Sequence, residues 1–403
     1  MEWSAIQAFM KSSRIHGWLI HDFRGSSSVL ARLLPASAGG GSEKRWTTRR
    51  VDFFIPAEGT PVVLSHNIDA LNFARPERWG QVRHETYMSW QQMHEWLRHR
   101  VSGKRIAMEY SAGGALPVVS SVDGGTIDLI RGLGAEVVSS ADLIQTAVSR
   151  WSAPALAEHL AISKLVDATK DAAFALIASS TRAGRTIYEH EVAQFIRDRF
   201  VADGLEYLDG PIVAVNAHAA DPHFEPSEKH PTVIKNNDWV LIDLWARRPG
   251  EDNLFSDVTW TGFVGATVPD LHRGVFETVR QARDASLALA QREWAAGRAV
   301  QGWQLDDAAR ETIISAGFER GLRHRTGHSL SPGLLVHGSG MNLDNLETHD
   351  TRTMLAGTGF TIEPGIYLPG EHLGVRNEIN VYVDESRGPI VTSGKQDAII
   401  LCG

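Results

Sequence analysis

The sequence contains very little cysteine and no strongly basic segment. Cys402 is the single cysteine among 403 residues, so an internal disulfide and a thiolate metal cluster are both excluded. The net charge is −8 at neutral pH, and the sequence contains no run of lysine and arginine. This balance argues against nucleic acid or an anionic membrane surface as a partner.

Long hydrophobic runs are missing as well. No segment approaches the roughly 18 to 20 consecutive apolar residues that a membrane-spanning helix needs. The first residues, MEWSAIQAFMKSS, lack the basic stretch and apolar core of a secretory signal. We therefore expect a cytoplasmic protein without a membrane partner.

The composition is that of a globular protein, with 43% hydrophobic and 22% charged residues. A chain of 403 residues exceeds what one core usually holds, which favours two domains. Residues 1–150 alternate strand-like and helical segments and predict a small α/β domain. The predicted strands are 17–23, 50–56, 61–66, 105–110 and 135–140, and 89–101 is the predicted helix. The proline-containing segment 149–160 places a boundary near residue 151.

Residues 151–403 show one plan twice: two helices followed by strands. Helical periodicity from Leu165 and from Leu271 opens the two halves, and strands are predicted at 211–216, 239–245 and 257–265 and then at 359–367, 375–383 and 398–402. The fold class is therefore α/β (α+β), and we expect two similar halves packed about a shared sheet. The identity between the halves is too low to prove a duplication.

The strand WVLIDLW places one carboxylate, Asp243, among six large apolar residues. A buried and unpaired carboxylate would cost several kcal/mol, so Asp243 needs a partner or a proton. Asp257 opens the next predicted strand, and the turn-rich RRPGEDN lies between the two. A hairpin would let both carboxylates face one point.

Two more acids lie in apolar strands, Glu363 in FTIEPGIY and Glu378 in VRNEINVYV, and His328 in HRTGHSL adds a nitrogen donor. Four carboxylates and an imidazole suit a pair of divalent cations, since carboxylates can bridge two metals and four negative charges balance two dications. Each acid could instead be a strand residue paired with arginine or capped by backbone amides. The spacing alone leaves both interpretations open.

These motifs resemble the signature of the pita-bread (M24) metallopeptidases, which include prolidases, aminopeptidases P and methionine aminopeptidases. The resemblance covers 151–403 through VLIDLW…FSDVTWTGFVG, HRTGHSL…VHG, FTIEPGIY and VRNEINVYV. GWLIHDFRGSSSVLARLL and RRVDFFIPAEGTPVVLSHNID resemble, more weakly, the N-terminal domain of prolidases, aminopeptidases P and creatinase. The resemblance implies a pita-bread catalytic domain at 151–403 behind a creatinase-like domain at 1–150, and it disfavours a methionine aminopeptidase.

The resemblance also implies roles for the five residues. Asp243 would bind one metal, Asp257 and Glu378 would bridge two, and His328 and Glu363 would complete the second. Glu363 would in addition take a proton from the metal-bridging water and deliver it to the leaving nitrogen.

Four further residues match the family's site. His223 would line the substrate pocket, His337 would contact the substrate carbonyl or the proline, His324 would lie behind the metals or in the pocket, and Arg376 would pair with the acids. Each histidine could instead be a bystander, since the chain has 17. Two intervals are longer than the family's, from Asp243 to Asp257 and from His328 to His337, and Gly338 replaces the usual acid.

The implied activity is hydrolysis of the bond before proline. We favour an Xaa-Pro dipeptidase (prolidase) with two divalent ions, Mn²⁺ or Zn²⁺ with Co²⁺ also suitable, acting on small peptides as a homodimer. The close alternative is an aminopeptidase P that accepts longer Xaa-Pro peptides. A metal-free creatinase-like hydrolase would not retain the ligand set. Nor would a non-catalytic binding module need it.

Selecting dipeptides requires a group that closes the site around a free amino group and a free carboxylate. The segment 37–50 has three consecutive glycines followed by four basic residues, and we hypothesise that it forms this closure. A solvated surface loop is the alternative.

Deleting 38–43 should relax the preference for Ala-Pro over longer Xaa-Pro peptides, measured as the ratio of their kcat/KM values. An unchanged ratio would remove the hypothesis.

Overall fold

The computed structural model describes residues 3–36, 47–250, 252–333 and 335–403. The chain divides into two compact units, Met1–Ser149 and Arg150–Gly403. Most of the hypothesised closing loop, residues 37–46, lies outside the described residues. No helix among the residues that the structure describes is both long and apolar enough to cross a membrane.

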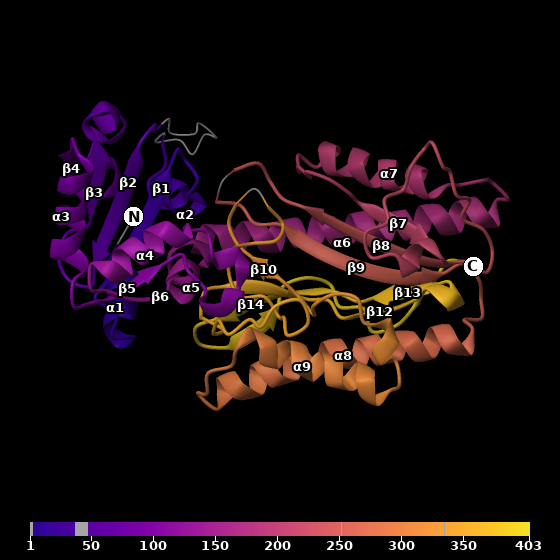
Figure 1. Cartoon of the computed structure of the whole chain (residues 1–403). Helices are drawn as coiled ribbons and strands as arrows, with labels where there is room; N and C mark the ends of the chain where they lie inside the picture. Colours follow the sequence, from indigo (N-terminus) through magenta and orange to yellow (C-terminus); the bar gives the residue numbers. More distant parts are fainter. Residues whose placement is uncertain (1–2, 37–46, 251, 334) are drawn as a thin grey trace. The chain divides into compact units, whose positions relative to one another are not determined.

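The first unit is built on one six-stranded sheet, in the order β4-β3-β2-β1-β5-β6 (Figure 1). Its strands are β1 (Gly17–Phe23), β2 (Arg50–Pro56), β3 (Val62–His66), β4 (Arg83–Tyr87), β5 (Arg105–Met108) and β6 (Glu136–Ser139). Its α-helices are α1 (Ser4–Ser12), α2 (Ser28–Leu33), α3 (Trp90–Val101), α4 (Gly124–Gly132) and α5 (Ala141–Ile144). The predicted bounds of β1 and β2 are confirmed.

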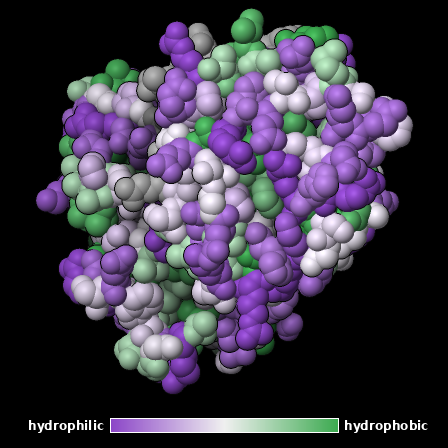
Figure 2. All heavy atoms as spheres, turned by 90° about the vertical axis from the view of Figure 1, so that its left-hand side faces the viewer, coloured by the Kyte–Doolittle hydropathy of each residue, from purple (hydrophilic) through white to green (hydrophobic). Residues whose placement is uncertain are grey.

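The central strands β1 and β2 are buried on both faces, which is why they are largely apolar. Trp18, Ile20 and Phe53 belong to the core on one face, and Leu19 and Phe54 to the core on the other. Figure 2 shows one side of the molecule, where hydrophilic residues predominate and hydrophobic residues appear in small groups between them. That face, over its coloured residues, presents no broad apolar patch.

The second unit contains two pairs of helices, α6 (Ala153–Arg182) with α7 (Glu189–Ala202) and α8 (Asp270–Ala295) with α9 (Gly302–Ser315). The strands lie between the pairs (Figure 1). They are β7 (Ile212–Val215), β8 (Trp239–Ala246), β9 (Ser256–Phe263), β10 (Ser329–Leu330), β11 (Gly359–Ile362), β12 (Gly365–Leu368), β13 (Leu373–Arg376), β14 (Ile379–Asp384), β15 (Gly388–Val391) and β16 (Ile400–Leu401). The predicted arrangement of two similar halves is confirmed.

The strands of this unit do not form the single shared sheet that the sequence predicts. They form two four-stranded sheets, β10-β11-β14-β15 and β16-β9-β8-β7, and a two-stranded ribbon, β12-β13. The predicted strands 359–367 and 375–383 are both interrupted, the first at Glu363–Pro364 and the second at Asn377–Glu378. Two of the predicted ligands therefore lie at strand breaks, outside the regular ladder.

Alternate residues of β8 serve two different cores. Val240, Ile242 and Leu244 pack with α6 and α7, whereas Trp239 and Leu241 pack with α8 and α9. Asp243 follows Trp239 and Leu241 on the second face, because successive strand residues point to opposite sides. The apolar residues around Asp243 are thus needed by both helix pairs.

A close backbone contact joins the site strands to the segment after β7. A Cβ atom on Gly374 of β13 would lie 1.7 Å from the carbonyl oxygen of Ala219. Since neither backbone can move easily, Gly374→Ala should destabilise the protein by about 1–3 kcal/mol or more. Thermal denaturation measures this as a lower Tm. Gly370→Ala is the matched control, since no atom lies within 4 Å of that Cβ position. Equal Tm values for the two variants would contradict the expected clash.

Candidate metal centre

The β8–β9 hairpin brings two of the acids to one face of its sheet. Asp243 pairs with Thr259, and Asp257 pairs with Trp245. Asp243 and Trp245 are two residues apart on one strand, as are Asp257 and Thr259 on the other, so all four side chains share a face. Both carboxylates are buried.

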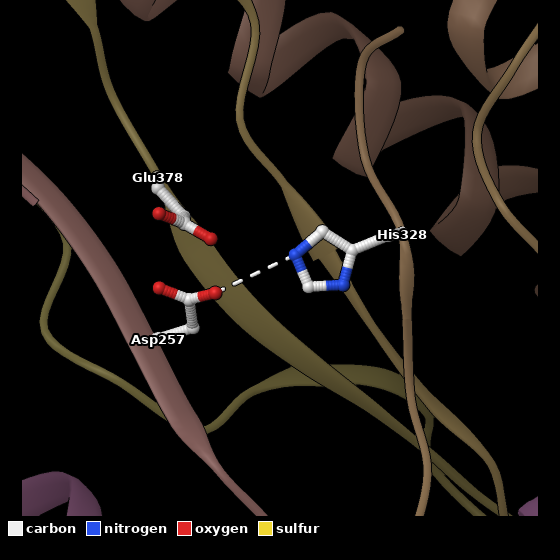
Figure 3. Close-up of side chains that lie close together, drawn as sticks. All are labelled: Asp257, His328 and Glu378. Atoms are coloured by element: carbon white, nitrogen blue, oxygen red, sulfur yellow. Dashed lines mark ion pairs between the residues drawn. The ribbon is translucent and has the colours of Figure 1, made fainter. Parts of the chain in front are cut away.

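Three ligand-type side chains from distant segments converge at this face. One atom each of Asp257, His328 and Glu378 lies within 4.8 Å of the others, and all three residues are buried. Figure 3 shows them pointing toward a common centre, Asp257 from β9, Glu378 from the break between β13 and β14, and His328 from the residue before β10. His328 Nε2 is 3.4 Å from Asp257 Oδ2 and 3.3 Å from Oε1 of Glu363.

Two threonine hydroxyls orient the acids, and the sequence analysis did not identify either. Thr259 donates to Glu378 Oε2 at 2.9 Å. Thr361 donates to Glu363 Oε1 at 3.0 Å and accepts the His328 amide N–H at 3.0 Å. Thr259 is two residues from Asp257 in the chain, and Thr361 is two residues from Glu363. This spacing, which places both side chains on one face of a strand, was the sequence feature that could have identified the threonines.

Arg376 is the cation within this group. Its guanidinium donates to Asp243 Oδ2, to Thr259 Oγ1 at 2.9 Å and to the hydroxyl of Tyr367 at 2.7 Å. Its Nε is also 4.0 Å from Glu363 Oε2. Arg376 is buried, and nearby anions hold its pKa well above the usual range despite the opposing effect of burial.

Tyr367 continues this chain of hydrogen bonds to His324. Burial lowers the pKa of His324, so its imidazole is neutral at neutral pH. Its Nδ1 lies 2.7 Å from the carbonyl oxygen of Arg325, which can only accept, so Nδ1 carries the proton. Nε2 must then accept from the Tyr367 hydroxyl, 2.8 Å away. The sequence analysis missed Tyr367 as well.

The protonation of His328 bears on whether the site suits a metal ion. Burial lowers its pKa, and its Nδ1 lies 3.2 Å from the carbonyl oxygen of Ser329, which assigns the proton to Nδ1. The lone pair of Nε2 then faces the carboxylates of Asp257 and Glu363. Without a cation that arrangement is repulsive, whereas a metal ion would accept all three lone pairs.

The carboxylates also have unsatisfied oxygens. Asp243 Oδ1, Asp257 Oδ1 and Glu378 Oε1 are buried and have no hydrogen-bond partner among the residues that the structure describes. Burial raises the pKa of Asp243 to about 7, and burial together with neighbouring acids raises the pKa values of Asp257 and Glu378 well above the usual range. Buried polar atoms normally have partners, so three unsatisfied carboxylate oxygens beside a free imidazole lone pair fit a divalent metal site.

Comparison with known proteins agrees with this chemistry. The family model named metallopeptidase family M24 matches residues 161–385. The chain belongs to this family. M24 peptidases are divalent-metal enzymes.

Two relatives show the range of the family. The protein named probable dipeptidase PepE from Mycobacterium tuberculosis is 31% identical over 219 residues, which are 54% of this chain and 52% of the relative. The Xaa-Pro dipeptidase of Lactobacillus helveticus is 32% identical over 167 residues, 41% of this chain and 40% of the relative. The chain thus spans about half the length of the curated relatives it matches.

Solved M24 structures have the same fold over nearly the whole chain. Dipeptidase PepE from Mycobacterium ulcerans superposes with a TM-score of 0.67 at 20% identity and covers 99% of this chain and 96% of its own. The X-Pro aminopeptidase of Thermotoga maritima gives a TM-score of 0.56 at 21% identity, with 97% and 99% covered. Both therefore share with this chain a pita-bread fold preceded by an N-terminal α/β unit.

The remaining histidines that match M24 motifs are placed differently from one another. The His337 ring lies 4.2 Å from the His328 ring, centroid to centroid, and His337 is exposed. His223 is exposed too, and its amide N–H donates to Asp221. His337 thus contacts His328 directly, and His324 is linked to Arg376 through Tyr367. Among the described residues, the His223 side chain makes no hydrogen bond or ion pair with the acids.

The departure from the M24 pattern at Gly338 has a steric reason. A Cβ atom there would lie 2.5 Å from the Ser331 hydroxyl oxygen and 2.6 Å from its backbone nitrogen. The Gly338 N–H donates to the Ser329 carbonyl oxygen at 2.7 Å, which holds the segment this close. An acidic side chain cannot occupy this position without moving the backbone.

The raised pKa of Asp243 predicts an unusual pH dependence for the metal-free protein. Folded Asp243 keeps its proton up to about pH 7, but the unfolded chain releases it near pH 4. The folded state therefore binds more protons over this interval, and stability is present below about pH 4 and lost as the pH rises through about 7. After chelation, the Tm should fall between pH 4.5 and 7.5.

Metal binding should reverse this trend, because deprotonated ligands bind cations more tightly. With Mn²⁺ restored, the Tm should rise over the same interval. Asp243→Asn should make the metal-free profile less steep, while the raised pKa values of Asp257 and Glu378 keep part of the slope. Asp270→Asn, at a position whose side chain is 92% exposed, should leave the slope unchanged. A metal-free Tm that increases toward pH 7.5 would contradict the assignment.

Proposed function

We propose that this chain is a dinuclear-metal peptidase that hydrolyses the bond between any residue and a following proline, with Xaa-Pro dipeptides as its main substrates. The observation that carries the proposal is the convergence of three buried carboxylates, the partly buried Glu363 carboxylate and the Nε2 lone pair of a neutral imidazole beside Arg376. Membership of family M24 and the dipeptidase names of its relatives support the reaction class.

The ligand set divides between two cations. Asp243 would hold one, His328 and Glu363 would hold the other, and Asp257 and Glu378 would bridge them. When bound, the cations lower the pKa of a water molecule toward neutrality and polarise the scissile carbonyl. Oxygen-rich ligands with one imidazole suit Mn²⁺, Zn²⁺ or Co²⁺.

Glu363 is the acid best suited to move a proton. Burial alone would raise its pKa, but the neighbouring side chains, among them the Arg376 guanidinium 4.0 Å away, outweigh burial and leave the pKa lowered, so Glu363 is ionised. Its side chain is 16% exposed, compared with 11% for Asp243 and 7% for Asp257. Glu363 can therefore reach a substrate, accept the proton of the attacking water and deliver it to the proline nitrogen.

The other residues orient these groups or contact the peptide. Arg376 fixes the Asp243 carboxylate and is itself fixed through Tyr367 and His324. His337, which is exposed beside His328, would contact the substrate carbonyl or the proline, and His223 would line the pocket. These assignments rest on the M24 motifs and on the positions described above.

The wider organisation is proposed on the same basis. The unit Met1–Ser149 would be the creatinase- and prolidase-like N-terminal domain, and Arg150–Gly403 the catalytic domain. We propose a cytoplasmic homodimer, as the family resemblance implies.

An aminopeptidase P is the second candidate, since the fold is shared with the X-Pro aminopeptidase of Thermotoga maritima. A non-catalytic module would not require three carboxylate oxygens without hydrogen-bond partners.

Hydrolysis of Ala-Pro, Gly-Pro and Ala-Pro-Ala by chelator-treated protein, with Mn²⁺, Zn²⁺ or Co²⁺ restored one at a time, separates these candidates. We expect metal-dependent cleavage with the dipeptides preferred. Faster cleavage of Ala-Pro-Ala would favour the aminopeptidase, and no cleavage with any metal would reject both.

In the same assay, Glu363→Gln should reduce kcat by about 10²–10⁴-fold, the range for loss of a general base or acid. Metal content is measured in parallel, because Glu363 is also a proposed ligand. Glu385→Gln, an exposed glutamate, is the control. Wild-type kcat in Glu363→Gln would exclude the proton-transfer role.

A further inference from the structure

The strand that carries Asp243 also carries a tryptophan on the same face. Trp245 lies directly opposite Asp257 in the β8–β9 ladder. Side chains in such positions have Cβ atoms about 4.5–5.5 Å apart. Trp245 is only partly buried, so an accessible indole borders the carboxylate cluster.

The orientation of this indole is fixed from two directions. Its Nε1 donates to Asp209 Oδ1 at 3.1 Å. Its ring lies over Gly210, where a Cβ atom would come within 2.5 Å of a ring carbon. Gly210 also has a φ of +74°, which few other residues adopt without strain. The indole is therefore held beside Asp257 rather than free to rotate.

Asp209 places an unneutralised charge next to the ring. The residue is exposed, and its bond to Trp245 is the only hydrogen bond or ion pair that its carboxylate makes with the residues the structure describes. The guanidinium of Arg197 donates to the carbonyl oxygen of the adjacent Gly210 at 2.9 Å and to Gln194 at 3.3 Å, and not to Asp209. One face of the site thus combines an indole ring with a free carboxylate.

That combination recognises cations. The face of an indole attracts ammonium and guanidinium groups, and a carboxylate beside it adds a charge-assisted hydrogen bond. In an Xaa-Pro peptide the proline side chain is an uncharged ring, so the residue before the bond must carry any side-chain cation.

We propose that Trp245 and Asp209 form a subsite for a cationic side chain on the residue preceding proline, so that Lys-Pro and Arg-Pro are preferred substrates. This subsite rests on the proposed function, because it requires cleavage at the adjacent carboxylates. Neither residue belongs to the predicted ligand set. Trp245 and Asp209 select the substrate and take no part in the chemical step.

Asp209→Asn is the sharpest test, since asparagine keeps an oxygen that can accept the Trp245 N–H and removes only the charge. The metal-loaded wild type and the variant are compared on Lys-Pro, Arg-Pro, Leu-Pro and Ala-Pro. The wild type should have its highest kcat/KM for the two cationic dipeptides. In the variant these values should fall about five- to tenfold, whereas those for Leu-Pro and Ala-Pro should change less than about twofold.

Two further variants complete the design. Trp245→Leu should lower kcat/KM for the cationic dipeptides more than for Leu-Pro, with Tm measured to confirm folding. Asp203→Asn, at the end of α7, is the matched carboxylate control and should change none of the ratios. Cleavage of all four dipeptides with the same ratios in wild type and Asp209→Asn would overturn the subsite alone. No cleavage of any of them by the wild type would overturn both the subsite and the proposed function.

Discussion

The concentration of buried negative charge is the constraint on which the second unit depends. Asp243 and Asp257 from strands β8 and β9 approach Glu363 and Glu378 from two strand breaks, and Arg376 supplies one positive charge. Burying carboxylates without compensation is costly, and the neutral His328 offers no proton to them. Divalent cations resolve this imbalance, and the surrounding hydroxyls and the Arg376–Tyr367–His324 chain then keep each ligand in place.

The candidate site was largely predictable because its charged residues lie within otherwise apolar strands. An acid in an apolar strand such as WVLIDLW is conspicuous, and four of them with a glycine-flanked histidine point to a metal. Thr259, Thr361 and Tyr367 were not found for the opposite reason. Threonine and tyrosine are ordinary residues of strands, so their hydrogen bonds to the acids and Arg376 become visible only in three dimensions.

The fold was predictable where the local pattern determines it. The bounds of β1 and β2 follow from continuous apolar segments between turns, and the four long helices follow from their periodicity. The division into separate sheets did not follow, because pairing between distant strands leaves no local signature. The interruption at Glu378 also escaped prediction, since alternation continues on either side of it, whereas Pro364 and Gly365 mark the break after Glu363.

The proposed ligands come from both halves of the second unit, and this has a consequence for how the protein assembles. Asp257 lies on a strand of the first half and Glu378 between strands of the second, and the Thr259–Glu378 hydrogen bond that orients one of them spans 119 positions of the chain. Neither half can build a complete coordination sphere while the other is unfolded. With these ligands, metal capture would be a late event in folding, and bound metal would act as a non-covalent cross-link that holds the two halves in register.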